Sequence, residues 1–164
     1  MESIVRAITE SDVPGYHRCL DVVARERRFL AFYEAPPLER SFAFVRSQLE
    51  SRAPMFVAAH ASEIVGWCDV SPLSRASLSH RGDLGMGVHP GYRGQGIGRR
   101  LLQTTLAAAR TFGLERVELA VLTNNTPAVA LYRSAGFELE GTIRRAQKLD
   151  DGYADDYIMA LFLQ

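Results

Sequence analysis

Val88-His89-Pro90-Gly91-Tyr92-Arg93-Gly94-Gln95-Gly96-Ile97-Gly98-Arg99-Arg100 is the segment that decides the fold of this chain. It follows an apolar run at 84–88 and leads into a helical pattern that begins near Gly96. A loop with glycines at positions 94, 96 and 98 carries little side chain, so successive backbone N–H groups can converge on an anion. The unpaired N–H groups and the positive dipole end of the helix favour negative charge at the same point. The segment therefore predicts a strand, a glycine loop and a helix that together bind a phosphate or pyrophosphate.

Other glycine-rich phosphate loops do not fit the letters of this segment. The dinucleotide-binding pattern G-x-G-x-x-G needs a glycine at position 99, where the chain has arginine. The Walker pattern needs Lys and then Ser or Thr, where the chain has Ile97 and Gly98. The pattern that fits is R/Q-x-x-G-x-G/A, from Arg93 to Gly98, and it resembles the acetyl-coenzyme A pyrophosphate loop of the GNAT superfamily of N-acetyltransferases. The alternative is a helix start that uses its glycines only to turn the chain.

A second motif follows further along the chain. Asn125-Thr126-Pro127-Ala128-Val129-Ala130-Leu131-Tyr132-Arg133-Ser134-Ala135-Gly136-Phe137 fits the pattern N-x-x-A-x-x-L-Y-x-x-x-G-F, which is similar to the other GNAT signature. A helix and a strand are expected between the two motifs, in the order that the family has. The resemblance covers about residues 4 to 163 and identifies the chain as a member of the GNAT superfamily, with 1–164 as a single N-acetyltransferase domain.

Composition and charge limit the other classes of function. The 164 residues suffice for one domain with a sizeable core, and 47% hydrophobic with 23% charged residues is ordinary for a globular protein. The 19 basic and 19 acidic side chains cancel, so no bulk attraction to nucleic acid is expected. Cys19 and Cys68 make no disulfide framework, and no cluster has metal-ligand spacing, so no metal is expected. Without a signal-peptide pattern or an apolar run near the ~20 residues of a membrane span, we expect a cytoplasmic protein with no membrane partner.

The rest of the sequence predicts the elements around the glycine loop. Periodicity and turn signals predict strands at 4–8, 55–60, 64–70, 83–88, 115–122, 137–149 and 153–163, and helices at 11–27, 38–49, 96–112 and 127–135. The order is β-α-α-β-β-β-α-β-α-β-β. Early hairpins with late crossovers predict an α/β fold with one mixed sheet and helices on both faces. The GNAT resemblance adds that the central sheet is splayed beside the strand that ends at Val88.

The same resemblance implies which residues meet acetyl-CoA. Backbone groups at 86–88 are expected along the pantetheine arm, and the N–H groups from 93 to 99 on the pyrophosphate. Tyr132 is expected to point its hydroxyl at the sulfur. The implied cofactor-binding residues are Met86, Gly87, Val88, Arg93, Gly94, Gln95, Gly96, Ile97, Gly98, Arg99 and Asn125.

The chemistry of acetyl transfer fits these residues. A primary amine has a pKa near ~10 and arrives as ammonium, so it must lose a proton before it attacks the thioester. The N–H group of Val88 can stabilise the oxyanion, and Tyr132 can protonate the departing thiolate as general acid. We therefore expect direct transfer in a ternary complex. A covalent acetyl-cysteine route would use Cys68 or Cys19, although each fits better as a small buried hydrophobic residue.

The general base is expected to be Asp83. It opens the cofactor strand at the position where phosphinothricin-type GNAT members carry a glutamate. Asp69 on the preceding strand and Glu34 beside two prolines are alternatives. Each of these carboxylates fits equally well as a solvated residue at the end of a strand or helix, without a catalytic role. A water relay would make a dedicated base unnecessary.

The acceptor is less constrained than the donor. Arginines and aromatic residues at 25–33 lie in the segment that usually roofs the acceptor pocket of the superfamily; they can take the carboxylate and side chain of an amino acid, or form a solvated helix end. Segments 66–70, 136–142 and 151–160 resemble a bacterial subgroup with L-amino-acid and ribosomal-protein acetyltransferases. We expect a small-molecule amine acceptor, most readily a free amino acid or small amine. A protein N-terminus and a non-catalytic coenzyme A-binding module are the alternatives, and a homodimer is expected by analogy.

Overall fold

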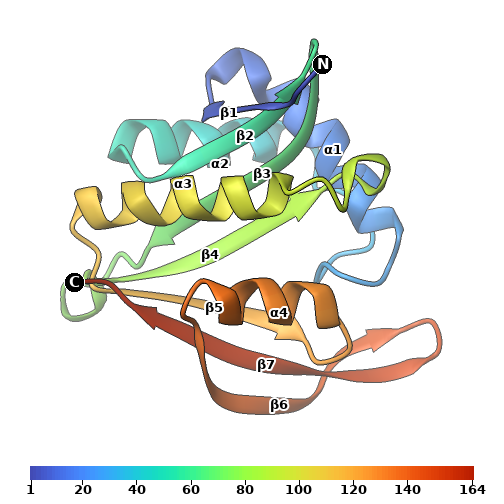
Figure 1. Cartoon of the computed structure of the whole chain (residues 1–164), viewed down its shortest axis with the longest axis vertical. Helices are drawn as coiled ribbons and strands as arrows, with labels where there is room; N and C mark the ends of the chain where they lie inside the picture. Colours follow the sequence, from blue (N-terminus) through green and yellow to red (C-terminus); the bar gives the residue numbers. More distant parts are fainter.

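One seven-stranded mixed sheet with four α-helices forms the protein, and the computed structural model describes residues 1–164. The strands lie in the order β1-β2-β3-β4-β5-β7-β6 across the sheet (Figure 1). Only β4 and β5 are parallel neighbours. The predicted α/β class and order of elements are confirmed. The elements are β1 (Ile4–Ala7), α1 (Val13–Arg25), α2 (Leu38–Ser51), β2 (Met55–His60), β3 (Glu63–Pro72), β4 (Arg81–Val88), α3 (Ile97–Phe112), β5 (Arg116–Leu122), α4 (Thr126–Ser134), β6 (Glu138–Leu149) and β7 (Gly152–Phe162).

The first helix is shorter than the predicted 11–27. A 3-10 turn at Glu10–Asp12 precedes α1, because the Asp12 carboxylate accepts the Thr9 N–H group at 2.8 Å and so caps the turn. The helix ends at Arg25, since Arg27 takes a left-handed conformation with φ 54°. The loop at 26–37 then leads to α2.

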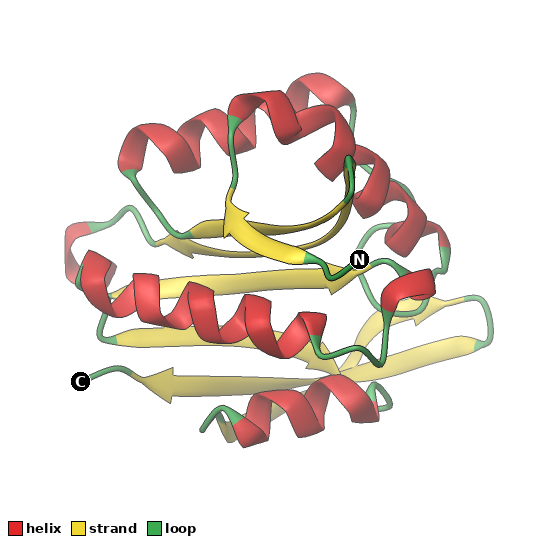
Figure 2. Cartoon of the chain, turned by 45° about the horizontal axis from the view of Figure 1, so that its top comes forward, coloured by secondary structure: helices red, strands yellow, loops and turns green.

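The two faces of the sheet carry separate hydrophobic clusters. On one face α1 and α2 cover Trp67, and on the other α3 and α4 cover Cys68 and Val117. Figure 2 shows the two pairs of helices on opposite sides of the sheet, as predicted. Because side chains alternate along a strand, positions 69, 83, 85 and 87 face α1 and α2, whereas 84, 86 and 88 face α3 and α4.

The strands β4 and β5 separate along their length. They pair only through Arg81–Asp83 and Arg116–Glu118, and Figure 1 shows them diverging towards the glycine loop. β4 stays paired with β3 as far as Val88, and β5 with β7 as far as Leu122. The sheet therefore opens into two halves, and the expected splay is confirmed.

The open edge of β4 presents backbone groups to this gap. The His89 N–H group donates to the carbonyl of Val65 at 2.8 Å, and antiparallel neighbours exchange hydrogen bonds at every second residue. Odd-numbered residues of β4 therefore bond to β3, and the N–H and C=O groups of Leu84, Met86 and Val88 face β5. Beyond the three paired residues, β5 does not take them up. A ligand in the gap can bind these groups, except the Val88 carbonyl, which accepts a hydrogen bond from the Arg93 Nε atom.

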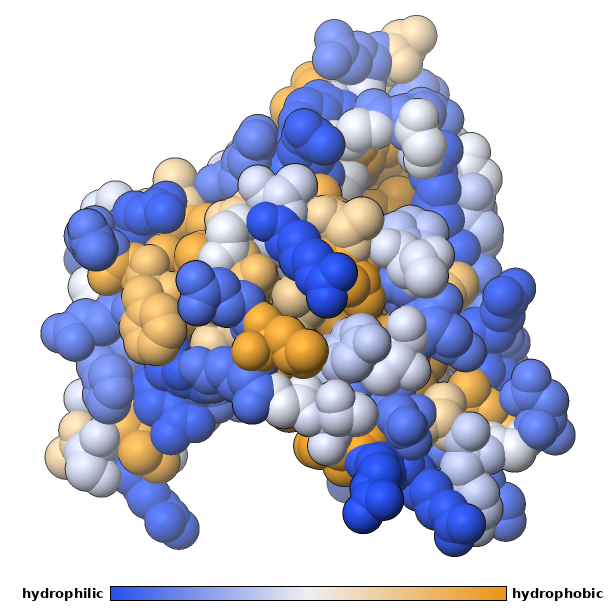
Figure 3. Space-filling model, turned by 60° about the horizontal axis from the view of Figure 1, so that its bottom comes forward, coloured by the Kyte–Doolittle hydropathy of each residue, from blue (hydrophilic) through white to orange (hydrophobic).

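The strand β6 forms one edge of the sheet, in a long hairpin with β7. Large apolar side chains on this hairpin reach the solvent, and Figure 3 shows hydrophobic residues among hydrophilic ones on the lower side of the molecule. The exposed apolar residues of the hairpin are Leu139, Ile143, Tyr153 and Phe162.

Candidate active site

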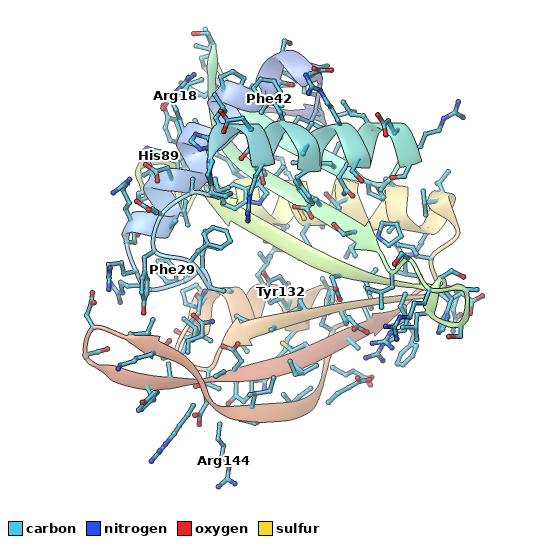
Figure 4. All side chains as sticks on the ribbon, turned by 180° about the vertical axis from the view of Figure 1, so that it is seen from behind. Arg18, Phe29, Phe42, His89, Tyr132 and Arg144 are labelled. Carbon is cyan, nitrogen blue, oxygen red and sulfur yellow. The ribbon has the colours of Figure 1, made fainter.

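A cavity of about 460 Å³ lies where β4 and β5 separate. The glycine loop, α3 and α4 supply its wall on one face of the sheet, and α1 with the loop that follows it supplies the wall on the other. Figure 4 shows Phe29 of that loop and Tyr132 of α4 in the gap between the two halves of the sheet, while Arg144 points away from the molecule. The cavity therefore connects both faces through the splayed sheet.

Most of the predicted site residues line this cavity. The side chains of Gln95 and Arg99 are exposed and do not line it, although their backbone N–H groups belong to the glycine loop and the first helical turn. Asp83 does not line it either. The predicted residues that do are Met86, Gly87, Val88, Arg93, Gly94, Gly96, Ile97, Gly98, Asn125 and Tyr132.

The glycine loop holds its shape through two left-handed residues. Gly94 and Gly96 have φ values of 76° and 79°, a conformation that is costly for residues with a side chain. A Cβ atom at either position would meet no protein atom within 4 Å. The first helical bond of α3 runs from the Arg100 N–H group to the Gly96 carbonyl, so the preceding N–H groups of the helix have no helical partner. They form an anion site at the positive end of a 16-residue helix.

Arg93 is committed to protein partners. Its Nε atom donates to the Val88 carbonyl at 2.9 Å, and its terminal nitrogens bind both oxygens of Glu26 at 2.9 and 2.6 Å. The guanidinium also lies over the ring of Phe29, 4.9 Å from its centre. The Arg93 side chain thus joins the glycine loop to the loop after α1. The expected contact of its backbone N–H group with the pyrophosphate stays a prediction.

Asn125 and Tyr132 come to the cavity from α4. The Asn125 side-chain oxygen accepts the Ala128 N–H group at 3.3 Å and caps the helix, which leaves its amide nitrogen free to face a ligand. Tyr132 is 8% exposed and packs at 5.7 Å, between ring centres, from Phe137. Burial raises the pKa of the Tyr132 phenol, so it is protonated across the neutral range.

A family model described as the acetyltransferase (GNAT) family matches residues 19–137, a range that contains both the glycine loop and α4. The chain belongs to the GNAT family of acetyltransferases. It is similar to N-alpha-acetyltransferase RimI of Mycobacterium tuberculosis, with 36% identity over 156 residues, 94% of this chain and 89% of that one. It is also similar to L-amino acid N-acetyltransferase AaaT of Escherichia coli, with 30% identity over 105 residues, 63% of this chain and 65% of the relative.

Solved structures have the same fold. A GNAT-family acetyltransferase from Streptococcus pneumoniae superposes with a TM-score of 0.92 at 26% identity, over 99% of this chain and 100% of that one. A phosphinothricin acetyltransferase from Sinorhizobium meliloti, solved in complex with acetyl-CoA, gives a TM-score of 0.92 at 18% identity, over 99% and 89%. As a GNAT acetyltransferase, this protein is an acyltransferase that uses acetyl-CoA. The glycine loop and the free edge of β4 fit that co-substrate.

The cavity also contains two polar residues that the sequence did not single out. Asp156 of β7 and Gln147 of β6 both line it, together with Phe29, Leu30 and Ala31 of the loop after α1. A carboxylate followed by the apolar run of β7 was the only signal in the sequence for Asp156. Gln147 had none, because an irregularity in β6 sets its direction.

The three carboxylates considered as the base of this GNAT enzyme lie in different surroundings. Asp83 is exposed where β4 and β5 are still paired, opposite Glu118. Asp69 is buried opposite Gly85 of the cavity wall, where a Cβ atom would lie 3.5 Å from its Oδ1 atom. Glu34 is exposed and pairs with Arg25 at 3.3 Å, away from the cavity.

The arginines at the end of α1 and in the loop that follows also have partners. Arg25 binds Asp21 at 2.7 Å, and Arg27 binds Asp150 of the β6–β7 turn at 2.7 Å. Neither lines the cavity, so the structure favours the solvated basic face over a carboxylate-binding role for these two residues. The loop after α1 nevertheless roofs one end of the cavity, as the family resemblance implied.

Both cysteines are buried and free. Burial raises the pKa of the Cys19 thiol to about 12, and it also raises that of Cys68. Neither lines the cavity, which argues against an acetyl-cysteine route. No group of three or more His, Cys, Asp or Glu side chains is placed to hold a metal ion. None of the helices has the length and apolar character needed to span a membrane.

We expect Asp69→Asn to stabilise the protein more strongly at about pH 8 than at about pH 4.5. Burial raises the pKa of Asp69 to about 7, and the Ser71 hydroxyl offsets part of this effect. The folded parent protein therefore binds the Asp69 proton more tightly than the unfolded chain does. The stability that this protonation gives the parent protein is complete below about pH 4 and is lost as the pH rises to about 7, so the advantage of the variant grows over this range. Asparagine carries no charge to desolvate, and the gain should be on the order of 2–4 kcal/mol.

Urea unfolding of both proteins across this pH range measures the effect. Asp151→Asn, at the exposed turn of the hairpin, is the control and should leave the pH dependence of stability unchanged. Parallel curves for Asp69→Asn and the parent protein would contradict the expectation.

Proposed function

We propose that this GNAT acetyltransferase moves the acetyl group of acetyl-CoA directly to a primary amine in a ternary complex. The observation that supports this is the single cavity that passes through the splayed sheet. Gly96, Asn125 and Tyr132 line it on the side of α3 and α4, whereas Phe29 and Asp156 line it on the side of α1. Donor and acceptor can enter from opposite faces and meet in the gap, which holds the reacting atoms together.

Backbone and side-chain groups of the gap have separate roles in this proposal. The N–H group of Val88 faces the gap and donates to the oxygen that becomes negative as the amine attacks. Arg93 fixes this strand end through its bond to the Val88 carbonyl. Tyr132 gives its proton to the leaving thiolate, and the positively charged nitrogen of the tetrahedral intermediate loses one proton, which restores the phenol. A raised pKa keeps the phenol protonated and ready for this step.

Asp83 remains our proposed base. Its pKa is raised first by partial desolvation and then by the charge of Glu118, which suits a base that works nearer to neutral pH. The residue lies one position before Leu84 of the cavity wall, so it takes the ammonium proton through water and not by direct contact. Asp69, behind Gly85, is the alternative.

We expect Asp83→Asn to lower kcat about 10- to 100-fold, because general bases contribute at least this much when they are well placed. Asp83→Glu should recover part of the rate. The Michaelis constant for acetyl-CoA should not change in either variant. If Asp83→Asn keeps the full rate and Asp69→Asn loses it, the base is Asp69; if neither loses it, a water relay without a dedicated base operates.

For the acceptor we propose a free amino acid or a small amine. The E. coli relative named L-amino acid N-acetyltransferase supports this class, and the relative named RimI supports a protein N-terminus as the second candidate. Release of free thiol from acetyl-CoA should be followed with L-amino acids, their amides, simple amines and peptides. Faster turnover of an amino acid than of its amide would show that the enzyme recognises the carboxylate of the substrate. Binding of acetyl-CoA without turnover of any acceptor would favour a non-catalytic coenzyme A-binding module.

Two further expectations stay proposals. A homodimer would cover apolar side chains of the β6–β7 hairpin, and sedimentation of the protein at several concentrations tests it. A cytoplasmic location agrees with the use of acetyl-CoA and with two free, buried cysteines.

A further inference from the structure

Asp156 is a buried carboxylate inside the cavity. It is 8% exposed, and it is the only acidic residue among those that line the cavity, where Arg93 is the only basic one. Because Arg93 is bound to Glu26, it supplies no counter-charge to Asp156. No lysine or arginine forms a salt bridge with Asp156. The carboxylate therefore stands in the cavity without a positive partner.

Gln147 is the only side chain that donates a hydrogen bond to this carboxylate. Its Nε2 atom lies 3.2 Å from Oδ1 and 3.5 Å from Oδ2 of Asp156. A neutral amide fixes the direction of the carboxylate but does not neutralise it. Burying a carboxylate in this way costs desolvation free energy unless a cation or further hydrogen-bond donors compensate it.

The chain builds this arrangement through a bulge in β6. Ile143 pairs with Asp156, and Gln147 pairs with Ala154. Between these two pairs β6 advances by four residues and β7 by two. Arg145, at φ 52°, holds the bulge by donating its N–H group to the Asp155 carboxylate at 2.8 Å. Without the extra residues, the amide of Gln147 would lie out of register with Asp156.

The pair lies at the acceptor end of the cavity. Asp156 pairs with Leu122 at the end of β5, across the gap from the free edge of β4. It shares the α1/α2 face with Gly85, which follows from the alternation of side chains along the paired strands. The anion site of the glycine loop lies at the start of α3, which covers the other face of the sheet, so the cavity has a place for a negative group on one face and a place for a positive group on the other.

We propose that Asp156, oriented by Gln147, binds the ammonium group of the acceptor before it is deprotonated. The proposal rests on the proposed function and names the recognition site for its acceptor. The ammonium ion is the resting form of a primary amine near neutral pH, and it offers three donors to the two carboxylate oxygens. The subsite selects a cationic amine, and the proton leaves in the later step assigned to Asp83 through water.

Binding of n-butylammonium to the coenzyme A-loaded protein tests the subsite without turnover. The side-chain amide signal of Gln147 in NMR spectra, identified by its loss in Gln147→Leu, should shift saturably with n-butylammonium and not with n-butanol. Asp156→Asn keeps an oxygen for the amide but removes the charge, and it should weaken this binding about tenfold or more. Glu138→Gln removes a charge from the same hairpin outside the cavity and should have no effect. An equal shift with n-butanol, or unchanged affinity in Asp156→Asn, would overturn the proposal.

Kinetics with an acceptor that turns over give the second readout. Asp156→Asn should raise the Michaelis constant for the amine about tenfold and leave that for acetyl-CoA within about twofold. An unchanged constant for the amine would overturn the subsite while leaving acetyl transfer intact. If no amine is acetylated, the proposed function fails, and the n-butylammonium titration still decides whether the subsite exists.

Discussion

Replacing Tyr132 by phenylalanine is expected to lower kcat for acetyl transfer by about 100-fold or more, with little change in affinity for acetyl-CoA. The substitution removes only the hydroxyl, so the ring keeps its packing against Phe137 and its place in the core. Without the phenol the thiolate leaves without a positioned proton donor, and general acids of this kind contribute 10²–10⁴-fold. Stopped-flow release of thiol and calorimetric binding of acetyl-CoA measure the two quantities separately.

Tyr153→Phe provides the matched control, because Tyr153 is exposed on the hairpin and does not line the cavity. It should retain the parent rate. The raised pKa of Tyr132 places any loss of rate from its ionisation at strongly alkaline pH. Loss of acetyl-CoA affinity in Tyr132→Phe, with an unchanged rate for each bound complex, would show that the hydroxyl binds the cofactor and is not the acid.

The second large effect is expected at the glycine loop, where Gly96→Ala should weaken acetyl-CoA binding about tenfold or more. The residue has φ 79°, and an L-residue pays about 1–2 kcal/mol to adopt this conformation. Its added methyl group would also enter cavity space, because no protein atom lies within 4 Å of the Cβ position and Gly96 lines the cavity. The N–H groups that face the pyrophosphate would then be displaced by either the strain or the methyl group.

Gly113→Ala is the control that separates the effect of backbone strain on stability from the effect of Gly96→Ala on acetyl-CoA binding. Gly113 ends the same helix with φ 102°, and a Cβ atom there also meets nothing within 4 Å, but it does not line the cavity. Both variants should lose a similar amount of stability in urea, and only Gly96→Ala should lose affinity in calorimetry. Equal affinity for acetyl-CoA in Gly96→Ala and the parent protein would remove the glycine loop from the proposed binding site.

The donor side could be predicted from the sequence because its determinants are local. The loop from Arg93 to Gly98 and the helix from Asn125 depend on glycine conformations, a helix cap and unpaired N–H groups, all within a few residues of each other. The turn at Gly152 likewise predicted the closing hairpin. The first helix was predicted too long, because an arginine at position 27 does not by itself indicate the left-handed conformation that ends the helix.

The charged side chains in and around the cavity could not be predicted in the same way. The sequence did not indicate that the Arg93 side chain binds Glu26, because the two residues are 67 positions apart. Asp83 looked well placed by its position in the strand, but it lies outside the cavity wall because β4 and β5 are still paired there. Distant pairings of this kind have no local pattern.

The sequence by itself determined the fold, the family and the use of acetyl-CoA, because strand alternation, helical spacing and the two glycine-containing motifs are patterns of residues that are close together in the chain. Only the tertiary structure decided which charges face the cavity. The bulge in β6 and the divergence of β4 from β5 bring Gln147 and Asp156 into the cavity and leave other carboxylates outside it. Strand register and burial set these positions, and both depend on contacts between segments far apart in the chain.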